Sequence, residues 1–577
     1  MAGGVKKPVN VFKLKDLGEP EGVFNWRLWF AVISFGLLGA ARGVDEGLIS
    51  GAFNSSDFKE AIDYNSYNDV DKANIKANVS AMVQIGSVAG ALMYDDKSSK
   101  FLKNSLLTCL SAFVVCDRIG RIWATRFLCT LWAIGIIIFM VGGINGSLGA
   151  IYAGRFIAGL GVGQTPVVGP VYIAEVAPAS IRGLCTCFFT GAVYIGIVLA
   201  YFTNYGAHIN IDSHSHNQWL VPTSLHIMFS GIAFILTFFQ FESPRFLIKQ
   251  GKVEQATEVL AKIRKQDPNS DYITNNIASI QAAHEHELEA SQGVGVLGKL
   301  KEMFLDKGNL YRLYLSTMVQ FLSQWSGAGS ITLYAPDLFK LIGITGSEEG
   351  LLVTAIFGIV KLIAAIGCAL FLVDVIGRKR ALLTGITLQA ISMIYVAAFL
   401  TSVPELGIVD GFVLPDKDKA ASRGAIAMIY VSGFGWALGW NSMQYLLTAE
   451  LFPLRIRALA TSWAMTLHFA NQYGNSRAVP NMLLSTSDGG ITPKGTFWCF
   501  AAVTILGGIW VFLSVPETSG RSLESMDALF ELPWYRIGLY GNKDADEKEV
   551  AFTEKQRTAE EQYGQTTQIE EKRPANV

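Results

Sequence analysis

The chain has 577 residues, of which 51% are hydrophobic and 16% are charged, and its mean hydropathy is +0.34. A water-soluble protein of this size would not stay in solution with that composition, so we expect the chain to lie in lipid. Its net charge of -1 excludes the basic excess that binding to nucleic acid requires.

The apolar residues gather in blocks of roughly 20, the length that a helix needs to cross a hydrocarbon core. We predict twelve spans, at residues 26–50, 76–93 continuing at 112–116, 122–143, 148–170, 184–206, 219–241, 311–336, 350–373, 380–401, 424–448, 458–484 and 496–515. A polar stretch divides these spans into six and six, and its charged run from Lys249 to Glu289 predicts short amphipathic helices at the membrane surface.

The charged residues of the short loops indicate the orientation, because basic residues collect on the cytoplasmic side. The basic residues of these loops, such as Arg126, Arg182 and Lys379, all fall on one side of a twelve-span count, which also places both chain ends inside. The expected order is a cytoplasmic tail at 1–23, a six-helix bundle at 24–241, a cytoplasmic linker at 242–308, a second six-helix bundle at 309–515 and a disordered cytoplasmic tail at 516–577. Of three glycosylation sequons, the one at Asn54 lies in the longest outside loop.

One loop signal occurs twice, as Asp117-Arg118-Ile119-Gly120-Arg121 after the second span and as Asp374-Val375-Ile376-Gly377-Arg378 after the eighth. A parallel repeat of this kind predicts two bundles that rock about a central site. The doubled Asp-x-x-Gly-Arg loop resembles the hallmark of the major facilitator superfamily. That resemblance implies an all-α membrane protein with twelve transmembrane helices in two six-helix bundles.

Further motifs make the chain similar to the sugar porter family from Gly43 to about Leu523. They are Gly154-Arg155-Phe156, Glu175-Val176-Ala177-Pro178 with Arg182-Gly183, Glu242-Ser243-Pro244-Arg245, Ala449-Glu450-Leu451-Phe452-Pro453-Leu454-Arg455-Ile456-Arg457 and Pro516-Glu517-Thr518. The resemblance implies a cytoplasmic network of ion pairs that holds the outward-open state. Its expected members are Asp117, Arg118, Arg121, Glu175, Arg182, Glu242, Arg245, Asp374, Arg378, Glu450 and Arg455. The other interpretation is that these residues are surface charge that only sets topology.

Asp45 is the leading candidate for proton coupling, because a charge within a span is costly and therefore functional by default. It stands in Gly43-Val44-Asp45-Glu46-Gly47, which is similar to a family motif whose aspartate belongs to proton-coupled members. Arg155 of the fourth span is the expected partner. An aspartate that loses its arginine partner takes up a proton more readily, so the pair can load and release a proton. A static ion pair that only orients helices is the alternative.

The expected substrate residues depart from those of hexose porters. In the seventh span Gln324 keeps one of the family's amides, in the tenth span Tyr445 replaces a tryptophan, and in the fifth span Thr190 replaces a glutamine. The eleventh span is unusually polar and carries Asn471 and Arg477. Because a buried arginine can bind a carboxylate with two hydrogen bonds, these residues favour a sugar acid such as galacturonate, or quinate, over a neutral hexose. The alternative is that Arg477 snorkels to the membrane surface or pairs with an internal carboxylate.

The first copy of the loop is separated from its span by a polar run, whereas the second copy follows its span directly. A polar run would interrupt a membrane helix. We therefore hypothesise that the stretch from Met93 to Ser111 is a translated intron whose removal would join the reading frame through an isoleucine. A genuine cytoplasmic insertion is the alternative.

The sequence thus predicts a secondary active transporter that takes up a sugar or sugar acid with protons by alternating access. A neutral hexose or pentose transporter, a transporter-like nutrient sensor and a channel are the alternatives. We expect no cofactor, no metal and no enzymatic activity, since neither a nucleophile with a base nor a phosphate loop is visible and the seven cysteines lack zinc-site spacing. The expected partners are the substrate, protons and the lipid bilayer, without nucleic acid, and we expect a monomer in the plasma membrane, with the vacuolar membrane as the alternative.

Overall fold

The computed structural model describes residues 19–20, 22–91, 119–178, 180–291, 296–344, 346–367, 377–406, 412, 414–441, 444, 451–518, 529–530 and 532–540. Within these residues the regular elements are all helices, and eight helical segments are long and apolar enough to cross a membrane. The stretch from Met93 to Ser111, for which we hypothesised a retained intron, lies outside the described residues.

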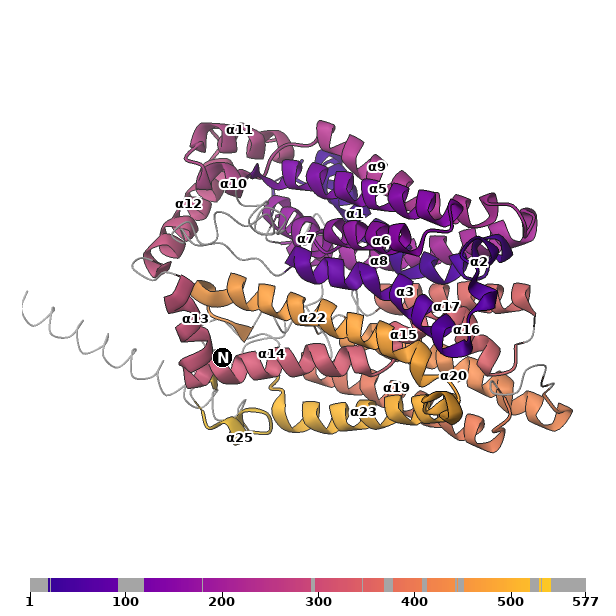
Figure 1. The fold of residues 1–577 in the computed structure, drawn as a ribbon. Helices are drawn as coiled ribbons and strands as arrows, with labels where there is room; N and C mark the ends of the chain where they lie inside the picture. The colour runs from indigo at the N-terminus through magenta and orange to yellow at the C-terminus, as the bar shows by residue number, and fades with distance from the viewer. Residues whose placement is uncertain are drawn as a thin grey trace, which may run out of the picture.

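The N-terminal half forms one bundle of long helices (Figure 1). Its helices are α1 (Trp26–Ala52), α3 (Asp69–Ala91), α5 (Arg121–Ile144), α6 (Leu148–Val162) with α7 (Thr165–Val176), α8 (Arg182–Asn210) and α9 (Asn217–Leu236), and the short elements are α2 (Ser56–Ala61), η2 (Tyr64–Ser66) and η4 (Thr237–Phe239). Asn25 caps α1 by accepting hydrogen bonds from the N–H groups of Arg27 and Leu28. The second long helix, α3, begins at Asp69, seven residues before the predicted span. Hydropathy did not identify its first two turns because they are polar.

The C-terminal half forms the second bundle. Its helices are α14 (Lys307–Trp325), α15 (Ala328–Leu333), α16 (Ala335–Leu341), α17 (Ser347–Gly367), α19 (Arg378–Ser402), α20 (Lys419–Leu438), α22 (Leu454–Met482) and α23 (Thr492–Ser514), with η6 (Asp416–Asp418), η7 (Thr486–Asp488) and the short α25 (Trp534–Ile537). The seventh span, predicted as continuous, is broken into α14, α15 and α16. The first break falls at Gly327, whose φ of +88° is one that residues with a side chain rarely adopt.

Four further helices connect the bundles and lie at one end of the molecule, which we call the linker side (Figure 1). They are α10 (Pro244–Lys249), α11 (Val253–Arg264), α12 (Asp271–Ser291) and α13 (Val296–Leu305). The amide of Asn25 donates to the carbonyl of Ile263 at 2.8 Å, so the linker is fixed against the first turn of α1. The opposite side carries α2 and α16.

Long apolar side chains point outward from the helices. On α23, Leu506, Ile509 and Phe512 are each more than half exposed. In water such a surface would cause aggregation, whereas in a bilayer it meets acyl chains of the same polarity. The outward-facing residues therefore agree with the composition in placing the chain in lipid.

Polar contacts join the two bundles on the opposite side. Lys76 of α3 pairs with Asp337 of α16 at 2.6 Å, and Arg477 of α22 donates to Asn74 of α3 at 2.9 Å. Deeper in the interface, the hydroxyl of Tyr201 on α8 donates to the carbonyl of Thr332 on α15 at 2.6 Å. The structure thus represents a state in which the halves of the bundles remote from the linker are in contact.

Glycines allow α1 and α8 to pack backbone against backbone. A Cβ placed at Gly196 would overlap the carbonyl oxygen of Ala40, and one at Gly43 would overlap that of Val193. Small residues at such crossings are what allows helices in lipid to gain van der Waals contact.

Replacing Gly196 with alanine should therefore destabilise the chain by about 1–3 kcal/mol, because the two helices have to move apart. Thermal unfolding in detergent measures the effect. Gly191→Ala on the same helix is the matched control, since a Cβ at Gly191 meets no atom within 4 Å. Equal melting temperatures for the two variants would refute the close packing.

Candidate transport site

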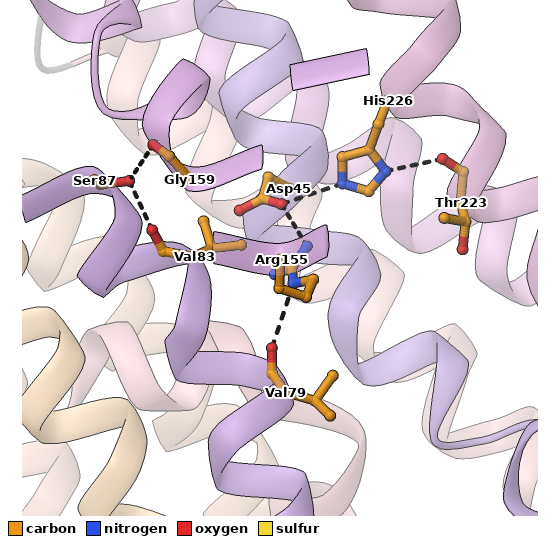
Figure 2. A network of polar contacts seen from close by, with 8 residues as sticks. All are labelled: Asp45, Val79, Val83, Ser87, Arg155, Gly159, Thr223 and His226. Atoms are coloured by element: carbon orange, nitrogen blue, oxygen red, sulfur yellow. Dashed lines mark hydrogen bonds and ion pairs between the residues drawn. The ribbon is translucent and has the colours of Figure 1, made fainter. Parts of the chain in front are cut away.

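Asp45 and Arg155 form an ion pair inside the first bundle, as the sequence predicted them to meet (Figure 2). Arg155 Nη1 lies 2.8 Å from Asp45 Oδ1, and both side chains are less than 5% exposed. Arg155 Nε also donates to the carbonyl of Val79 on α3 at 3.3 Å. Buried charges in this setting are costly and pairing stabilises them, so the pair links α1 to α6 and α3.

His226 of α9 is a third member of this group, and the sequence analysis missed it. Its Nε2 lies 3.3 Å from Asp45 Oδ1, and its Nδ1 lies 2.9 Å from the carbonyl oxygen of Thr223 (Figure 2). A carbonyl oxygen only accepts, so Nδ1 carries a hydrogen. A neutral ring would then turn the lone pair of Nε2 toward the carboxylate. The close approach is favourable only when a proton is held on His226 Nε2 or on Asp45.

A second polar group, the central cluster, lies between the bundles and consists of Arg42, Glu46, Gln320, Gln324 and His468. Arg42 Nε is 3.5 Å from Glu46 Oε1, and Arg42 Nη2 is 3.4 Å from His468 Nε2 across the interface. His468 Nδ1 lies 3.2 Å from the side-chain amides of both Gln320 and Gln324. The cluster supplies donors and acceptors at the centre of the molecule, where they can meet a hydroxylated ligand.

The remaining expected substrate residues are spread over different places. Asn471 accepts a hydrogen bond from Trp325 Nε1 at 3.2 Å, and Thr190 is half-buried on α8. Arg477, which we expected to bind a carboxylate, bonds to Asn74 and lies nine residues beyond His468, about 13 Å farther along α22 toward the opposite side. Tyr445 lies outside the described residues.

Lys361 of α17 is a buried cation that the sequence analysis also missed. Its Nζ lies 2.6 Å from Thr332 Oγ1 and 5.3 Å from the centre of the Tyr194 ring, and the residue is 3% exposed. A single lysine within an apolar span was the signal that could have identified it, by the same rule that identified Asp45.

On the linker side, Arg121 and Glu175 form a two-point ion pair. Arg121 Nε and Nη2 lie 2.9 and 2.8 Å from the two carboxylate oxygens of Glu175, and both residues belong to the first bundle. Such forked pairs are among the strongest charge-assisted contacts. Glu242 accepts from the backbone N–H groups of Arg121 and Ile122 and thereby caps α5, although burial raises the pKa of Glu242 above its ordinary value.

The second half repeats this cap. Glu517 accepts from the backbone N–H groups of Arg378 and Lys379 at 2.8 and 3.1 Å, at the first turn of α19. Gly120 and Gly377 precede the two capped helices with φ of +93° and +94°, and a Cβ on either would press against the capping carboxylate. The glycine of the repeated motif is thus required both by its backbone angle and by the approach of the glutamate. The sequence analysis named Glu517 as part of a family motif but assigned no role to it.

The structure shows few contacts for the other residues that we expected in the cytoplasmic network of ion pairs. Arg182 is half-buried at the start of α8, with Arg245 as a neighbouring like charge, and within the part of the chain that the structure describes its Nε has no hydrogen-bond partner. Asp117, Arg118, Asp374 and Glu450 lie outside the described residues, as does the side chain of Arg455. Among the described residues, no group of histidine, cysteine, aspartate and glutamate is placed to hold a metal ion.

Residues 30–530 match the model of the family described as Sugar (and other) transporter. The chain belongs to this family. It is 29% identical over 518 residues to a probable quinate permease of Aspergillus niger, with 90% of each chain covered. It is also 29% identical to the quinate permease of Emericella nidulans over 521 residues, covering 90% of this chain and 91% of that one. The predicted resemblance to the sugar porter family is confirmed, and these relatives are of the quinate permease type.

Solved structures confirm the fold class. The proton:xylose symporter XylE bound to 6-bromo-6-deoxy-D-glucose superposes with a TM-score of 0.68 at 23% identity, over 87% of this chain and 99% of that one. A partially occluded inward-open form of the xylose transporter XylE from E. coli gives 0.67 at 21% identity, over 86% and 100%. These structures show the major facilitator fold, and the family match makes the chain a multi-pass membrane transporter whose relatives are permeases rather than enzymes.

Proposed function

We propose that the chain takes up a hydroxylated ring acid of the quinate type together with protons. The buried group of Asp45, Arg155 and His226 carries this proposal, because it has the components of a proton site inside a transporter fold. The quinate permeases among the relatives support the substrate class. The linker side, rich in basic residues, is the cytoplasmic side, and the plasma membrane is the proposed location.

The coupling follows from the charges of the proton site. With Asp45 ionised, Arg155 is held between α1 and α6; a proton on Asp45 neutralises the carboxylate and weakens that hold. Because α1 also carries Arg42 and Glu46 of the central cluster, a shift of α1 on protonation reaches the substrate residues. Proton binding and substrate binding then favour the same arrangement of the bundles, which is the condition for symport.

Uptake assays test the proposal directly. Cells that express the chain should accumulate radiolabelled quinate and make the external medium more alkaline, and a protonophore should abolish the accumulation. Accumulation of quinate above its external concentration that persists with the protonophore would contradict proton coupling. Uptake of glucose or xylose in place of quinate and galacturonate would contradict the substrate class, and binding without uptake would indicate a sensor.

The role of His226 predicts a change in pH dependence. His226→Gln keeps a polar side chain of similar size but removes the second base, so that Asp45 beside Arg155 has to hold the proton alone. The pH profile of uptake should change, because the site loses the ring nitrogen that lies 3.3 Å from the carboxylate of Asp45. Lower uptake at every pH with the profile unchanged would show that His226 only supports packing against Trp132.

A further inference from the structure

Lys361 has no ionic partner among the residues that the structure describes. Its Nζ contacts the hydroxyl of Thr332 at 2.6 Å, and the rings of Tyr194 and Phe357 lie 5.3 and 5.4 Å away. All of these neighbours are neutral. An ammonium group has three hydrogens to donate, and Thr332 accepts only one of them. A cation buried in this way is costly unless a negative charge reaches it during the working cycle.

Lys361 lies at the interface between the two bundles. Tyr194 belongs to α8 of the first bundle, whereas Thr332 and Phe357 belong to the second. Tyr194 stands one helical turn from Thr190, the residue of α8 that we expected to contact substrate. Glu46 lies within 3.5 Å of Arg42 and therefore belongs to the central cluster.

We propose that Lys361 binds the carboxylate of the substrate, while the amides of the central cluster bind the hydroxyl groups of its ring. This inference rests on the proposed function, since it requires an anionic substrate. The two hydrogens of Nζ that Thr332 leaves can be donated to the two carboxylate oxygens. Tyr194 and Phe357 shield the pair from water, which strengthens a charge-assisted hydrogen bond.

The geometry favours Lys361 over the two arginines of the interface. Arg477 donates to Asn74 near the opposite side, far from the central amides. Arg42 has Glu46 and His468 as partners, so a substrate carboxylate there would have to displace an internal one. No described neighbour places a negative charge within ion-pair distance of Lys361. A substrate carboxylate there would therefore pair with the lysine without displacing an internal group.

Binding of quinate and of its neutral methyl ester to the purified full-length chain, measured by isothermal titration calorimetry, tests the inference. Wild type should bind quinate roughly tenfold to a hundredfold more tightly than the ester. Lys361→Gln should lose that preference by weakening quinate binding while leaving the affinity for the ester unchanged. Lys361→Arg should keep the preference because the charge remains. Lys340→Gln, which removes an exposed lysine at the end of α16, is the matched control and should behave as wild type.

The outcomes separate the inference from the proposed function. If wild type binds neither quinate nor its ester, the proposed substrate class is wrong. If wild type binds quinate and its ester equally, or if Lys361→Gln keeps the preference for quinate, the class stands and the role of Lys361 is refuted. Equal weakening of both ligands in Lys361→Gln would show that the lysine only stabilises the fold. The comparison of quinate with its methyl ester in wild type needs no variant. It therefore tests the carboxylate preference even if Lys361→Gln fails to fold.

Discussion

Asp45→Asn should abolish the accumulation of substrate against its gradient while leaving the exchange of labelled for unlabelled substrate across the membrane. An asparagine still accepts a hydrogen bond from Arg155, so the helix contacts at 2.8 Å are largely kept. It cannot take up a proton, and it leaves His226 without a carboxylate beside it to favour a proton on the ring, so we expect the proton gradient no longer to drive the cycle.

The measurement is the ratio of internal to external substrate at steady state, together with the rate of exchange in proteoliposomes. Asp69→Asn is the matched control, because Asp69 is an exposed aspartate whose partner is Lys72. Accumulation at the wild-type level in Asp45→Asn would show that the proton is carried elsewhere. Loss of exchange together with accumulation would show that Asp45 has a structural role alone.

Much of the architecture could be predicted because lipid imposes a simple rule on sequence. A helix that crosses a bilayer needs about 20 apolar residues, and the blocks that contain α5, α8 and α23 satisfy that rule by themselves. The polar helices α3 and α22 do not, since they bury Gln84, His468 and Asn475 against the other bundle. They were nevertheless placed as spans at 76–93 and 458–484 from the apolar residues between these polar ones.

The partners of side chains were harder to predict than their positions in spans. Asp45 and Arg155 could be paired in advance because the family resemblance joins them, whereas His226 approaches Asp45 from a helix 181 positions later with no motif around it. Arg477 was expected at the substrate and lies beside Asn74, because hydropathy does not tell how far along a helix a polar residue meets its partner. Lys361 was overlooked because one charge scarcely lowers the hydropathy of α17.

The contact between α8 and α17 predicts a crosslink that stops transport. An ideal Cβ at Gly358 lies 3.3 Å from Val198 Cγ2 across the bundle interface. In a disulfide, the sulfur of one cysteine lies about 3 Å from the Cβ of the other, so Val198→Cys with Gly358→Cys can form a bond with little backbone movement. The bond would hold the two helices in the arrangement of the structure.

Alternating access requires the bundles to separate on the side that is closed in this state, so oxidation of the double variant should reduce uptake to the background level and a reductant should restore it. The two single variants should transport equally with and without oxidant, which also controls for the seven native cysteines. Crosslinking is measured by cleaving the linker between the bundles and asking whether the halves stay joined on a non-reducing gel. A fully crosslinked chain that still transports would show that α8 and α17 move as one body, and that the bundles rock about this contact rather than opening it.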